Sequence, residues 1–335
     1  MKVEIYVDDL TVADADSTFA DLELEELSQA FSTPTKDGAK PGLTMEPAAF
    51  FLGGNIDRPS PDRVRLSSRA YVDRLAAKWL AKPPDEFPAI HTPATKELSA
   101  AYEDALLREE TPSSELLSRY ASKCGAVIYA VPSTRGDVAW AVGMCARTLT
   151  FPTARMEKCL DRVILYLAQH RDLALVFDGT HDSPLHAYSD SDWAVGHSTT
   201  GWAVMFGNAA VGYGSKRQQS IALSSTEAEI MAASRTALEV MFFRGVLRDL
   251  GVDVSEPTVV YVDNRSAIAL SHDRRSCHRS RHILRRYLKV REFVAEGHIR
   301  VEYVSTADNV ADLFTKSLDR EGHWKHARVL FGIRE

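Results

Sequence analysis

The sequence lacks several features that would identify a secreted, membrane-spanning or disulfide-stabilised protein. It has four cysteines and no CxxC pair, so free thiols in a reducing compartment are the simplest interpretation. No apolar run approaches the roughly 20 residues that cross a bilayer. The N-terminal segment MKVEIYVDDL does not have the pattern of a secretory signal. These absences favour an intracellular protein without a membrane partner.

Charge is distributed unevenly along the 335 residues. The composition, 45% hydrophobic and 26% charged, is typical of a folded protein of two or three domains, and the net charge is −6. From Arg274 to Arg291, however, eight lysines and arginines occur without one acidic residue. Such a run can neutralise phosphates, while a solvated surface helix and a nuclear address are the alternatives. The residues predicted to contact nucleic acid are Arg279, Arg281, Arg285 and Arg286, with Lys216 and Arg217 as a second group.

The predicted elements form two patterns that meet near residue 184. The first pattern starts with a hairpin over 3–13, a helix over 17–32 and a strand over 50–56. Its later helices are predicted at 67–81, 116–131, 135–150 and 152–170, interrupted by Pro132 and Pro152. The second pattern has strands at 185–190, 200–207, 209–215, 258–263 and 299–305, and helices at 224–250, 265–271, 279–296 and 309–318. This order predicts an α/β (α+β mixed) fold with a mixed five-stranded sheet and flanking helices.

Four carboxylates occur where this pattern would let them meet. Asp190 ends the strand LHAYSD and Asp263 ends the strand VVYVD, so parallel pairing would bring both to one edge of the sheet. Glu229 lies on the stripe of the helix over 224–250 that is otherwise apolar and should face the core. Asp312 belongs to the first turn of the last predicted helix. A core-facing carboxylate needs an explanation, and metal ligation supplies one.

Carboxylates gathered at one point repel one another and need cations. Mg²⁺ is a hard ion that prefers oxygen ligands. Two such ions about 4 Å apart can activate water and stabilise the leaving oxygen of a phosphodiester. Each position taken alone has an ordinary structural interpretation, as a turn aspartate or a solvated glutamate. The joint pattern favours a metal site.

Six segments, in order, resemble a known family. They are YSDSDWA (188–194), STTGWAVMFG (198–207), SKRQQSIALSSTEAEIMA (215–232), VYVDNRSAIAL (260–270), RSRHI (279–283) and VSTADNVADLFTK (304–316). These segments resemble the ribonuclease H domain of copia-type retrotransposons. The resemblance implies cleavage of the RNA strand of an RNA–DNA hybrid with two Mg²⁺ ions, Mn²⁺ being the alternative ion.

The resemblance also assigns residues, position by position. It implies that the catalytic and metal-binding residues are Asp190, Glu229, Asp263 and Asp312. Two nearby acidic residues are rivals for these assignments. Asp192 competes with Asp190, and Glu227 competes with Glu229 but is better interpreted as a helix-capping residue, three positions after Ser224.

The first half of the chain resembles the preceding part of the same polyproteins. YVDD (6–9), FLGGNI (51–56), HTPAT (91–95) and YASKCGAVIYAVPSTRGDVAW (120–140) follow in the order found at and after the catalytic hairpin of a reverse transcriptase. The resemblance implies that Asp8 and Asp9 are a polymerase remnant. A third palm aspartate and the fingers are missing from the 335 residues, so polymerase activity is not expected of this chain alone.

We therefore expect four parts: a truncated reverse-transcriptase palm (1–60), a helical thumb or connection (61–183), a ribonuclease H-like domain (184–318) and a C-terminal tail (319–335). The expected function is hydrolysis of RNA in RNA–DNA hybrids, with a full-length reverse transcriptase or other Pol products as further partners. The alternatives are a catalytically inactive nucleic-acid-binding relic and a structural subunit of a longer reverse transcriptase. A cytoplasmic retrotransposon particle and the nucleus are both open as its location.

Overall fold

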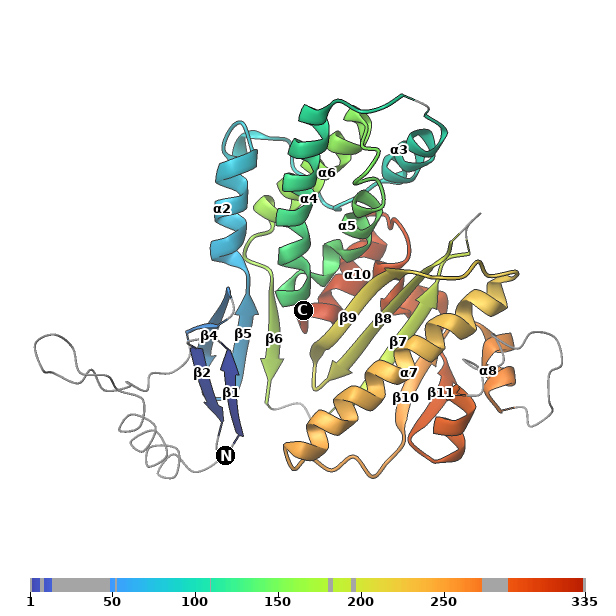
Figure 1. Ribbon diagram of the computed structural model, residues 1–335. Coiled ribbons are helices and arrows are strands. Elements are labelled where there is room, and N and C mark those ends of the chain that lie inside the picture. Colours follow the sequence, from blue (N-terminus) through green and yellow to red (C-terminus); the bar gives the residue numbers. More distant parts are fainter. Residues whose placement is uncertain are drawn as a thin grey trace, which may run out of the picture. The chain divides into compact units, whose positions relative to one another are not determined.

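A computed structural model describes residues 2–6, 9–13, 49–51, 53–108, 110–179, 183–193, 197–272 and 289–333. The chain divides into two compact units, Met1–Leu52 and Gly53–Glu335. In the first unit, β1 (Lys2–Tyr6) pairs antiparallel with β2 (Asp9–Ala13) (Figure 1). A short strand, β3, covers Phe50–Phe51. The hairpin predicted over 3–13 is confirmed, whereas the helix predicted over 17–32 lies outside the described residues.

Helices make up most of the first half of the second unit. They are α2 (Arg69–Trp79), α3 (Lys96–Leu107), α4 (Ser114–Thr134), α5 (Ala139–Ala146) and α6 (Ala154–Gln169), with the 3-10 helices η1 (Pro84–Glu86) and η2 (Gly136–Val138). Their apolar faces enclose a core that includes Tyr120 and Leu160. We predicted that the first long helix stops before Pro132, which is wrong, because α4 continues to Thr134. Pro132 falls in the last turn, so the helix continues for only two residues beyond it.

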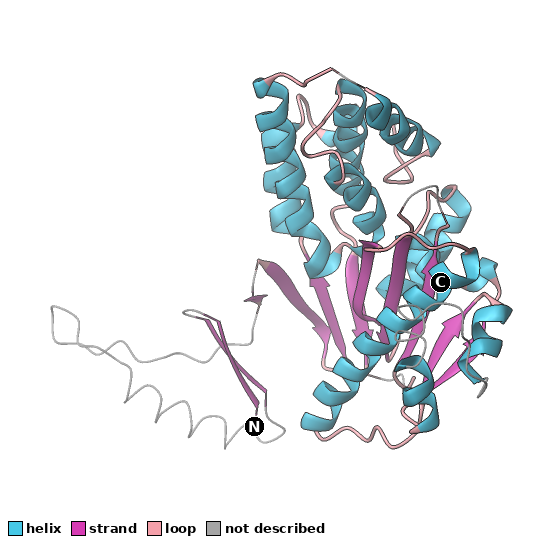
Figure 2. Ribbon diagram, turned by 45° about the vertical axis from the view of Figure 1, so that its right-hand side comes forward, coloured by secondary structure: helices cyan, strands magenta, loops and turns pink. Residues whose placement is uncertain are grey.

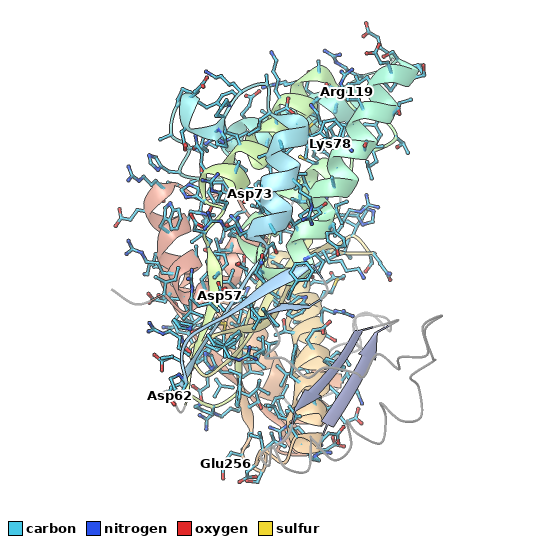
Figure 3. All side chains as sticks on the ribbon, turned by 90° about the vertical axis from the view of Figure 1, so that its left-hand side faces the viewer. Asp57, Asp62, Asp73, Lys78, Arg119 and Glu256 are labelled. Carbon is cyan, nitrogen blue, oxygen red and sulfur yellow. The ribbon has the colours of Figure 1, made fainter. Side chains whose placement is uncertain are left out.

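A small antiparallel sheet precedes and follows these helices in the chain. Its strands are β4 (Gly54–Ser60), β5 (Arg63–Ser67) and β6 (Ala174–Asp178), with β5 between the other two. We did not predict β5 or β6 from the sequence. Figure 3 shows Asp57 and Asp62 on the β4–β5 hairpin and Asp73 on α2, and all three are exposed. The β4–β5 hairpin therefore carries two exposed carboxylates.

The second half of the unit is built on a mixed five-stranded sheet (Figure 2). The strands are β7 (His186–Ser191), β8 (Thr199–Phe206), β9 (Ala209–Arg217), β10 (Thr258–Val262) and β11 (Ile299–Tyr303), in the spatial order β11-β10-β7-β8-β9. β7, β10 and β11 run parallel, and β8 and β9 form an antiparallel meander after β7. The predicted mixed five-stranded sheet is confirmed.

Helices cover both faces of this sheet. On one face lies α7 (Ser225–Asp249), followed after β10 by the shorter α8 (Arg265–His272). On the other face lies the C-terminal α10 (Arg320–Phe331), inside the segment that we expected to be a tail (Figure 1). Its residues Ala327, Leu330 and Phe331 are fully buried in a core that also contains strand residues of β8 and β9. Among the described helices, none is long and apolar enough to cross a membrane.

The segment predicted as a helix over 309–318 has a different structure. It forms two 3-10 helices, η3 (Thr306–Asp308) and η4 (Val310–Phe314). The cause is Asn309, which is fully buried. Its side chain accepts a hydrogen bond from the backbone of Ala311 at 3.2 Å and donates one to the carbonyl of Ser189 on β7 at 3.0 Å. These bonds hold the segment against the end of β7 as tight turns.

Candidate catalytic centre

Two of the predicted acidic residues lie side by side because of strand order. β7 and β10 are parallel neighbours, with Ser189 opposite Val262. Asp190 and Asp263 follow these paired residues, so both carboxylates emerge at the same edge of the sheet. η4 brings Asp312 to the same point. One ligand oxygen from each of Asp190, Asp263 and Asp312 lies within 4.8 Å of the others, which gives a three-carboxylate cluster.

Hydroxyl groups anchor two members of this cluster. The Thr315 hydroxyl donates to Oδ2 of Asp190, and the Thr306 hydroxyl donates to Oδ2 of Asp263 at 2.8 Å. Both threonines come from the segment that carries Asp312, so one stretch of chain fixes all three carboxylates. Asp190 is 3% exposed and Asp312 is 4% exposed, so neither charge is well hydrated.

Glu229 approaches the same strand end from α7. It is 6% exposed and lies in the predicted stripe, whose members Ala232, Thr236 and Val240 are all buried. Oε1 of Glu229 accepts hydrogen bonds from the backbone and the hydroxyl of Ser191, at 3.3 and 3.1 Å. Oε2 of Glu229 has no hydrogen-bond partner within the described part of the chain. A buried carboxylate oxygen rarely stays unpaired. A bound cation would give this atom the partner that the described residues do not supply.

The two rival acidic residues have structural partners. Oε2 of Glu227 accepts from the backbone of Leu223 at 2.8 Å, and the Ser224 hydroxyl accepts from the backbone of Glu227 at 3.1 Å. Glu227 therefore caps the start of α7. Asp192 accepts hydrogen bonds from the backbone and the hydroxyl of Thr199, the latter at 2.9 Å. Its carboxylate joins the end of β7 to the start of β8.

The electrostatics of the cluster follow from burial and mutual repulsion. Burial, followed by the charges of Asp190 and Asp263, raises the pKa of Glu229 to about 9. Burial, followed by the charge of Asp190, raises the pKa of Asp312 to about 7. Burial also raises the pKa of Asp190. Carboxyl groups with raised pKa values are common at functional sites, including sites that bind a cation.

One cation of the described residues belongs to the cluster, and it was not among the site residues predicted from the sequence. Nζ of Lys316 lies 2.8 Å from Oδ1 of Asp312 and 3.7 Å from Oδ2 of Asp190. Burial lowers the pKa of Lys316, but the charges of Asp190 and Asp312 outweigh it and the net shift is upward. The available signal was its position, four residues after Asp312 in VADLFTK, on the same side of the turn.

The donor set matches a hard divalent cation. All of the cluster's ligand atoms are carboxylate oxygens, three of them lie within 4.8 Å, and Glu229 adds an unpaired oxygen near the end of β7. Mg²⁺ and Mn²⁺ take such ligands, whereas softer ions prefer nitrogen and sulfur. The residues present therefore fit the group that the resemblance implies.

Lys216 and Arg217 lie at the end of β9, and this is the end of the sheet at which the acidic cluster lies. Lys216 is opposite Thr200, which is in turn opposite Ser191 on β7. Two strand spacings, roughly 10 Å, therefore separate them from the end of β7. Both side chains are exposed. With Gln218, Ser234 and Arg235 among other residues, they line a groove of about 220 Å³.

The remaining predicted site residues are not placed by the structure. Arg279, Arg281, Arg285 and Arg286 lie outside the described residues. Asp8 is also outside them, and Asp9 is described only as the first residue of β2.

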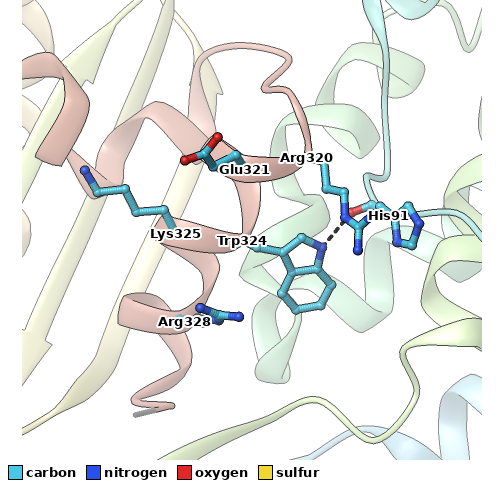
Figure 4. Close-up of a pocket in the computed structure, with 6 residues that line it drawn as sticks. All are labelled: His91, Arg320, Glu321, Trp324, Lys325 and Arg328. Carbon is cyan, nitrogen blue, oxygen red and sulfur yellow. Dashed lines mark hydrogen bonds between the residues drawn. The ribbon is translucent and has the colours of Figure 1, made fainter. Parts of the chain in front are cut away.

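A larger groove, of about 810 Å³, lies beside α10 (Figure 4). It is lined by His91, Arg320, Glu321, Trp324, Lys325 and Arg328. The indole Nε1 of Trp324 donates to the carbonyl of His91 at 2.9 Å. None of the predicted site residues lines this groove, so the acidic cluster is identified by its chemistry and not by cavity volume.

Comparisons with known proteins point to one family. No family model matches the chain. The chain is 32% identical over 324 residues to the Retrovirus-related Pol polyprotein from transposon RE1 of Arabidopsis thaliana, covering 94% of this chain and 20% of that protein. It is also 32% identical over 321 residues to the corresponding polyprotein from transposon TNT 1-94 of Nicotiana tabacum, covering 94% and 23%. The chain spans roughly a fifth of the length of these curated relatives.

Solved structures give weaker similarities. An N-terminal RNase H domain from Mycobacterium tuberculosis is 13% identical, with a TM-score of 0.32, over 43% of this chain and 96% of that chain. A foamy viral protease-reverse transcriptase in complex with dsDNA is 14% identical, with a TM-score of 0.41, over 91% of this chain and 55% of that chain. These TM-scores are low, and the strand order described above stands without them.

Proposed function

Because the chain belongs to the copia-type retrotransposon Pol polyproteins, we propose that its second half hydrolyses the RNA strand of RNA–DNA hybrids. The observation that supports this proposal is the convergence of Asp190, Asp263 and Asp312 at one sheet edge, with Glu229 facing the same strand end. Such a cluster is costly in a protein that does not use it, since buried like charges destabilise one another. The proposed domain for this activity is residues 184–318.

We propose that Asp190, Glu229, Asp263 and Asp312 hold the metal. Bound Mg²⁺, or Mn²⁺ in its place, would supply an activated water and charge stabilisation at the leaving oxygen. The chain's own part is positioning. Thr315 and Thr306 hold the Asp190 and Asp263 carboxylates in fixed orientations, and Ser191 holds one oxygen of Glu229 so that the other stays free. Burial of the Asp190, Glu229 and Asp312 carboxylates keeps bulk water from screening their charges.

We propose that Lys216 and Arg217 contact the phosphate backbone of the bound hybrid. They lie at the edge of the sheet that carries the acidic cluster, and within the described residues neither has an acidic partner. The sequence adds Arg279, Arg281, Arg285 and Arg286 to this proposal, as a second basic segment. A duplex bound across the end of the sheet that carries the acidic cluster would then contact these basic side chains. The proposed partners are an RNA–DNA hybrid and, beyond it, a full-length reverse transcriptase or other Pol products.

A cleavage assay tests the activity. The full 335-residue chain is incubated with a hybrid labelled on its RNA strand, in Mg²⁺ and in EDTA. We expect Mg²⁺-dependent shortening of the RNA, and loss of cleavage in the Asp190→Asn variant, because asparagine keeps the shape and removes the charge that holds the metal. Asp308→Asn is the matched control. Asp308 is exposed, belongs to the same segment and bonds Ser305 and Lys325 outside the cluster.

Two results would count against the proposal. Cleavage by Asp190→Asn at the wild-type rate would rule out the acidic cluster as the catalytic centre. Hybrid binding without cleavage in the wild type would instead support the alternative function, a catalytically inactive nucleic-acid-binding relic. Glu229→Gln provides a second check, since we expect it to lose cleavage while binding to the hybrid is retained.

The salt dependence of binding tests the proposed phosphate contacts. We expect the double variant Lys216→Gln, Arg217→Gln to bind the hybrid more weakly and with a shallower slope of log affinity against log salt. Each lost phosphate contact should lower that slope by about 0.7–0.9. Lys158→Gln, an exposed cation on α6, is the control and should keep the wild-type slope. An unchanged slope in the double variant would place the duplex elsewhere.

A further inference from the structure

Lys316 has an unusual place for a lysine. Its ammonium group contacts Asp312 at 2.8 Å and Asp190 at 3.7 Å, and these two residues are also members of the three-carboxylate cluster. In the described part of the chain, no other cation lies within 4.0 Å of any of the three aspartates. The charge of Lys316 therefore offsets part of the repulsion within the cluster.

The same two carboxylates are among the four that we propose to bind metal. Oδ1 of Asp312 and Oδ2 of Asp190 cannot accept a close ammonium group and an inner-sphere divalent ion at full strength, because the two cations repel each other. The Lys316 ammonium group and a divalent ion therefore compete for these two carboxylates. Mg²⁺ carries twice the charge and binds at about 2 Å, so it should win at sufficient concentration.

Lys316 can leave its place without disturbing its neighbours. Its side chain is 39% exposed, and lysine has a flexible four-carbon stem that lets the ammonium move into water. The Thr315 hydroxyl, which anchors Asp190, comes from the adjacent residue and does not depend on the lysine head group. Asp190 would keep its orientation when the ammonium departs.

We propose that Lys316 is a resident counter-cation, which holds a metal position of the acidic cluster and gives it up when a divalent ion binds. Lys316 then sets the concentration at which metal enters, and it limits repulsion within the cluster in the absence of metal. This inference rests on the metal binding proposed above. It does not rest on hydrolysis, so it can hold even if the chain cleaves nothing.

Metal binding to a variant without the charge tests the proposal. Full-length Lys316→Gln and wild type are titrated with Mg²⁺, and the rise in melting temperature is followed, since binding to the folded state alone raises it. We expect the half-saturating Mg²⁺ concentration to fall about fivefold in Lys316→Gln, the upper end for a partly exposed ion pair. Lys325→Gln is the matched control. Lys325 contacts Asp308 at the same distance, 2.8 Å, outside the cluster, and its removal should leave metal binding unchanged.

A measurement on the wild type decides the question if the variant does not fold. Lysine side chains are acetylated with an N-hydroxysuccinimide ester in EDTA and in Mg²⁺, and the modified residues are identified by mass spectrometry. We expect Mg²⁺ to increase the modification of Lys316 and to leave that of Lys325 unchanged, because displacement frees the Lys316 ammonium.

The outcomes separate this inference from the proposed function. Equal or weaker Mg²⁺ binding by Lys316→Gln, or a Lys316 that Mg²⁺ does not make more reactive, would overturn the counter-cation role. Absence of any Mg²⁺ effect on the wild-type melting temperature would overturn both this role and the proposed metal site. Tighter metal binding in Lys316→Gln, together with a failure to cleave the hybrid, would support the inference and remove the hydrolytic function.

Discussion

Glu229 is a carboxyl group that water scarcely reaches, on a helix face that is otherwise apolar. A charge in that position would be costly, and the structure reduces the cost by favouring the protonated form. Burial and the nearby aspartates raise the pKa of Glu229 to about 9, so without metal this side chain is neutral at pH 7. A neutral acid can share the stripe with Ala232 and Thr236. The ionised form becomes favourable once a cation is present.

This shift predicts that Mg²⁺ binding depends on pH. The folded pKa of Glu229, about 9, is above its ordinary value of 4.5, so its stabilising effect on the metal-free fold is complete below 4.5 and is lost as pH rises through 9. Metal must displace that proton. We therefore expect the affinity for Mg²⁺ to rise as the pH is raised from 6.5 to 8.5. The increase should be up to about tenfold per pH unit if one proton is released on binding. Calorimetric titration in buffers of different ionisation enthalpy counts the protons.

The matched variants assign this proton to a residue. Glu229→Gln should bind Mg²⁺ more weakly, release fewer protons and show a flatter pH dependence. Glu227→Gln, a change in the capping carboxylate of the same helix, should keep the wild-type proton release. Proton release that is the same in Glu229→Gln as in the wild type would mean that Asp312, whose pKa is raised to about 7, accounts for the effect instead.

At the scale of elements, the centre depends on how closely η4 approaches β8. Gly201 on β8 lies under η4, and a Cβ built there would meet the carbonyl oxygen of Ala311 at 2.8 Å and Cγ2 of Thr315 at 2.7 Å. No other residue type fits without a shift of the backbone. The same segment carries Asp312 and the Thr315 hydroxyl that anchors Asp190. The spacing of the acidic cluster is therefore set partly by the absence of a side chain on β8.

We expect Gly201→Ala to displace η4 and to weaken the centre. Overpacking of this kind typically costs about 1–3 kcal/mol of unfolding free energy. Because the displaced segment holds Asp312, Mg²⁺ should also raise the melting temperature of the variant less than that of the wild type. Gly245→Ala on α7 is the control, since its Cβ would meet nothing within 4 Å. It should be neutral or stabilising by up to about 1 kcal/mol. Wild-type metal binding by Gly201→Ala would show that η4 adjusts freely.

The elements also show what the sequence could and could not predict. The strand ends at Asp190 and Asp263 and the buried stripe of α7 follow from periodicity, which is a local property of the chain. β6 was missed because it is short and pairs with β5 across more than a hundred residues, so its hydrogen bonds are set by tertiary structure. β5 also pairs with β4 across a two-residue turn, and this local hairpin was overlooked. The 3-10 turns around Asp312 were missed for a similar reason, since buried Asn309 bonds to β7, which is far away in sequence. Lys316 was overlooked because its role depends on that turn.

At the scale of the whole second unit, the helical half and the five-stranded sheet share contacts and a core. The Tyr213 hydroxyl on β9 donates to the carbonyl of Val131 on α4 at 2.7 Å, and Arg147 donates to the Thr199 hydroxyl on β8 at 2.9 Å. The hydroxyl of Tyr166 on α6 lies 2.8 Å from Nε2 of His323 on α10. Thr199 also binds the Asp192 carboxylate at the end of β7. The start of β8, beside the acidic cluster, is thus tied to the helical half.

The side chain of Asn208 makes a second joint within this unit. It lies in the turn between β8 and β9, and its Nδ2 donates to the carbonyl of Val176 on β6 at 2.8 Å and to that of Gly332 at 3.1 Å. Gly332 ends α10 with a positive φ of 67°, and a Cβ there would clash with the Val176 carbonyl oxygen. The end of α10 therefore packs against both the small antiparallel sheet and the five-stranded sheet. This close packing requires glycine at position 332.

These joints predict how stability changes when the chain is shortened. Residues 184–318 alone would lack Ala327, Leu330 and Phe331, which are fully buried against the sheet. Loss of a large buried side chain typically costs about 2–5 kcal/mol, so we expect 184–335 to be more stable than 184–318 by several kcal/mol. The full chain should be more stable still, since Leu175 and Ala139 complete the same core. Urea unfolding of the three proteins in EDTA measures the differences. Equal stability of 184–318 and 184–335 would mean that α10 packs on the sheet without stabilising it, and that the acidic centre needs nothing beyond residue 318.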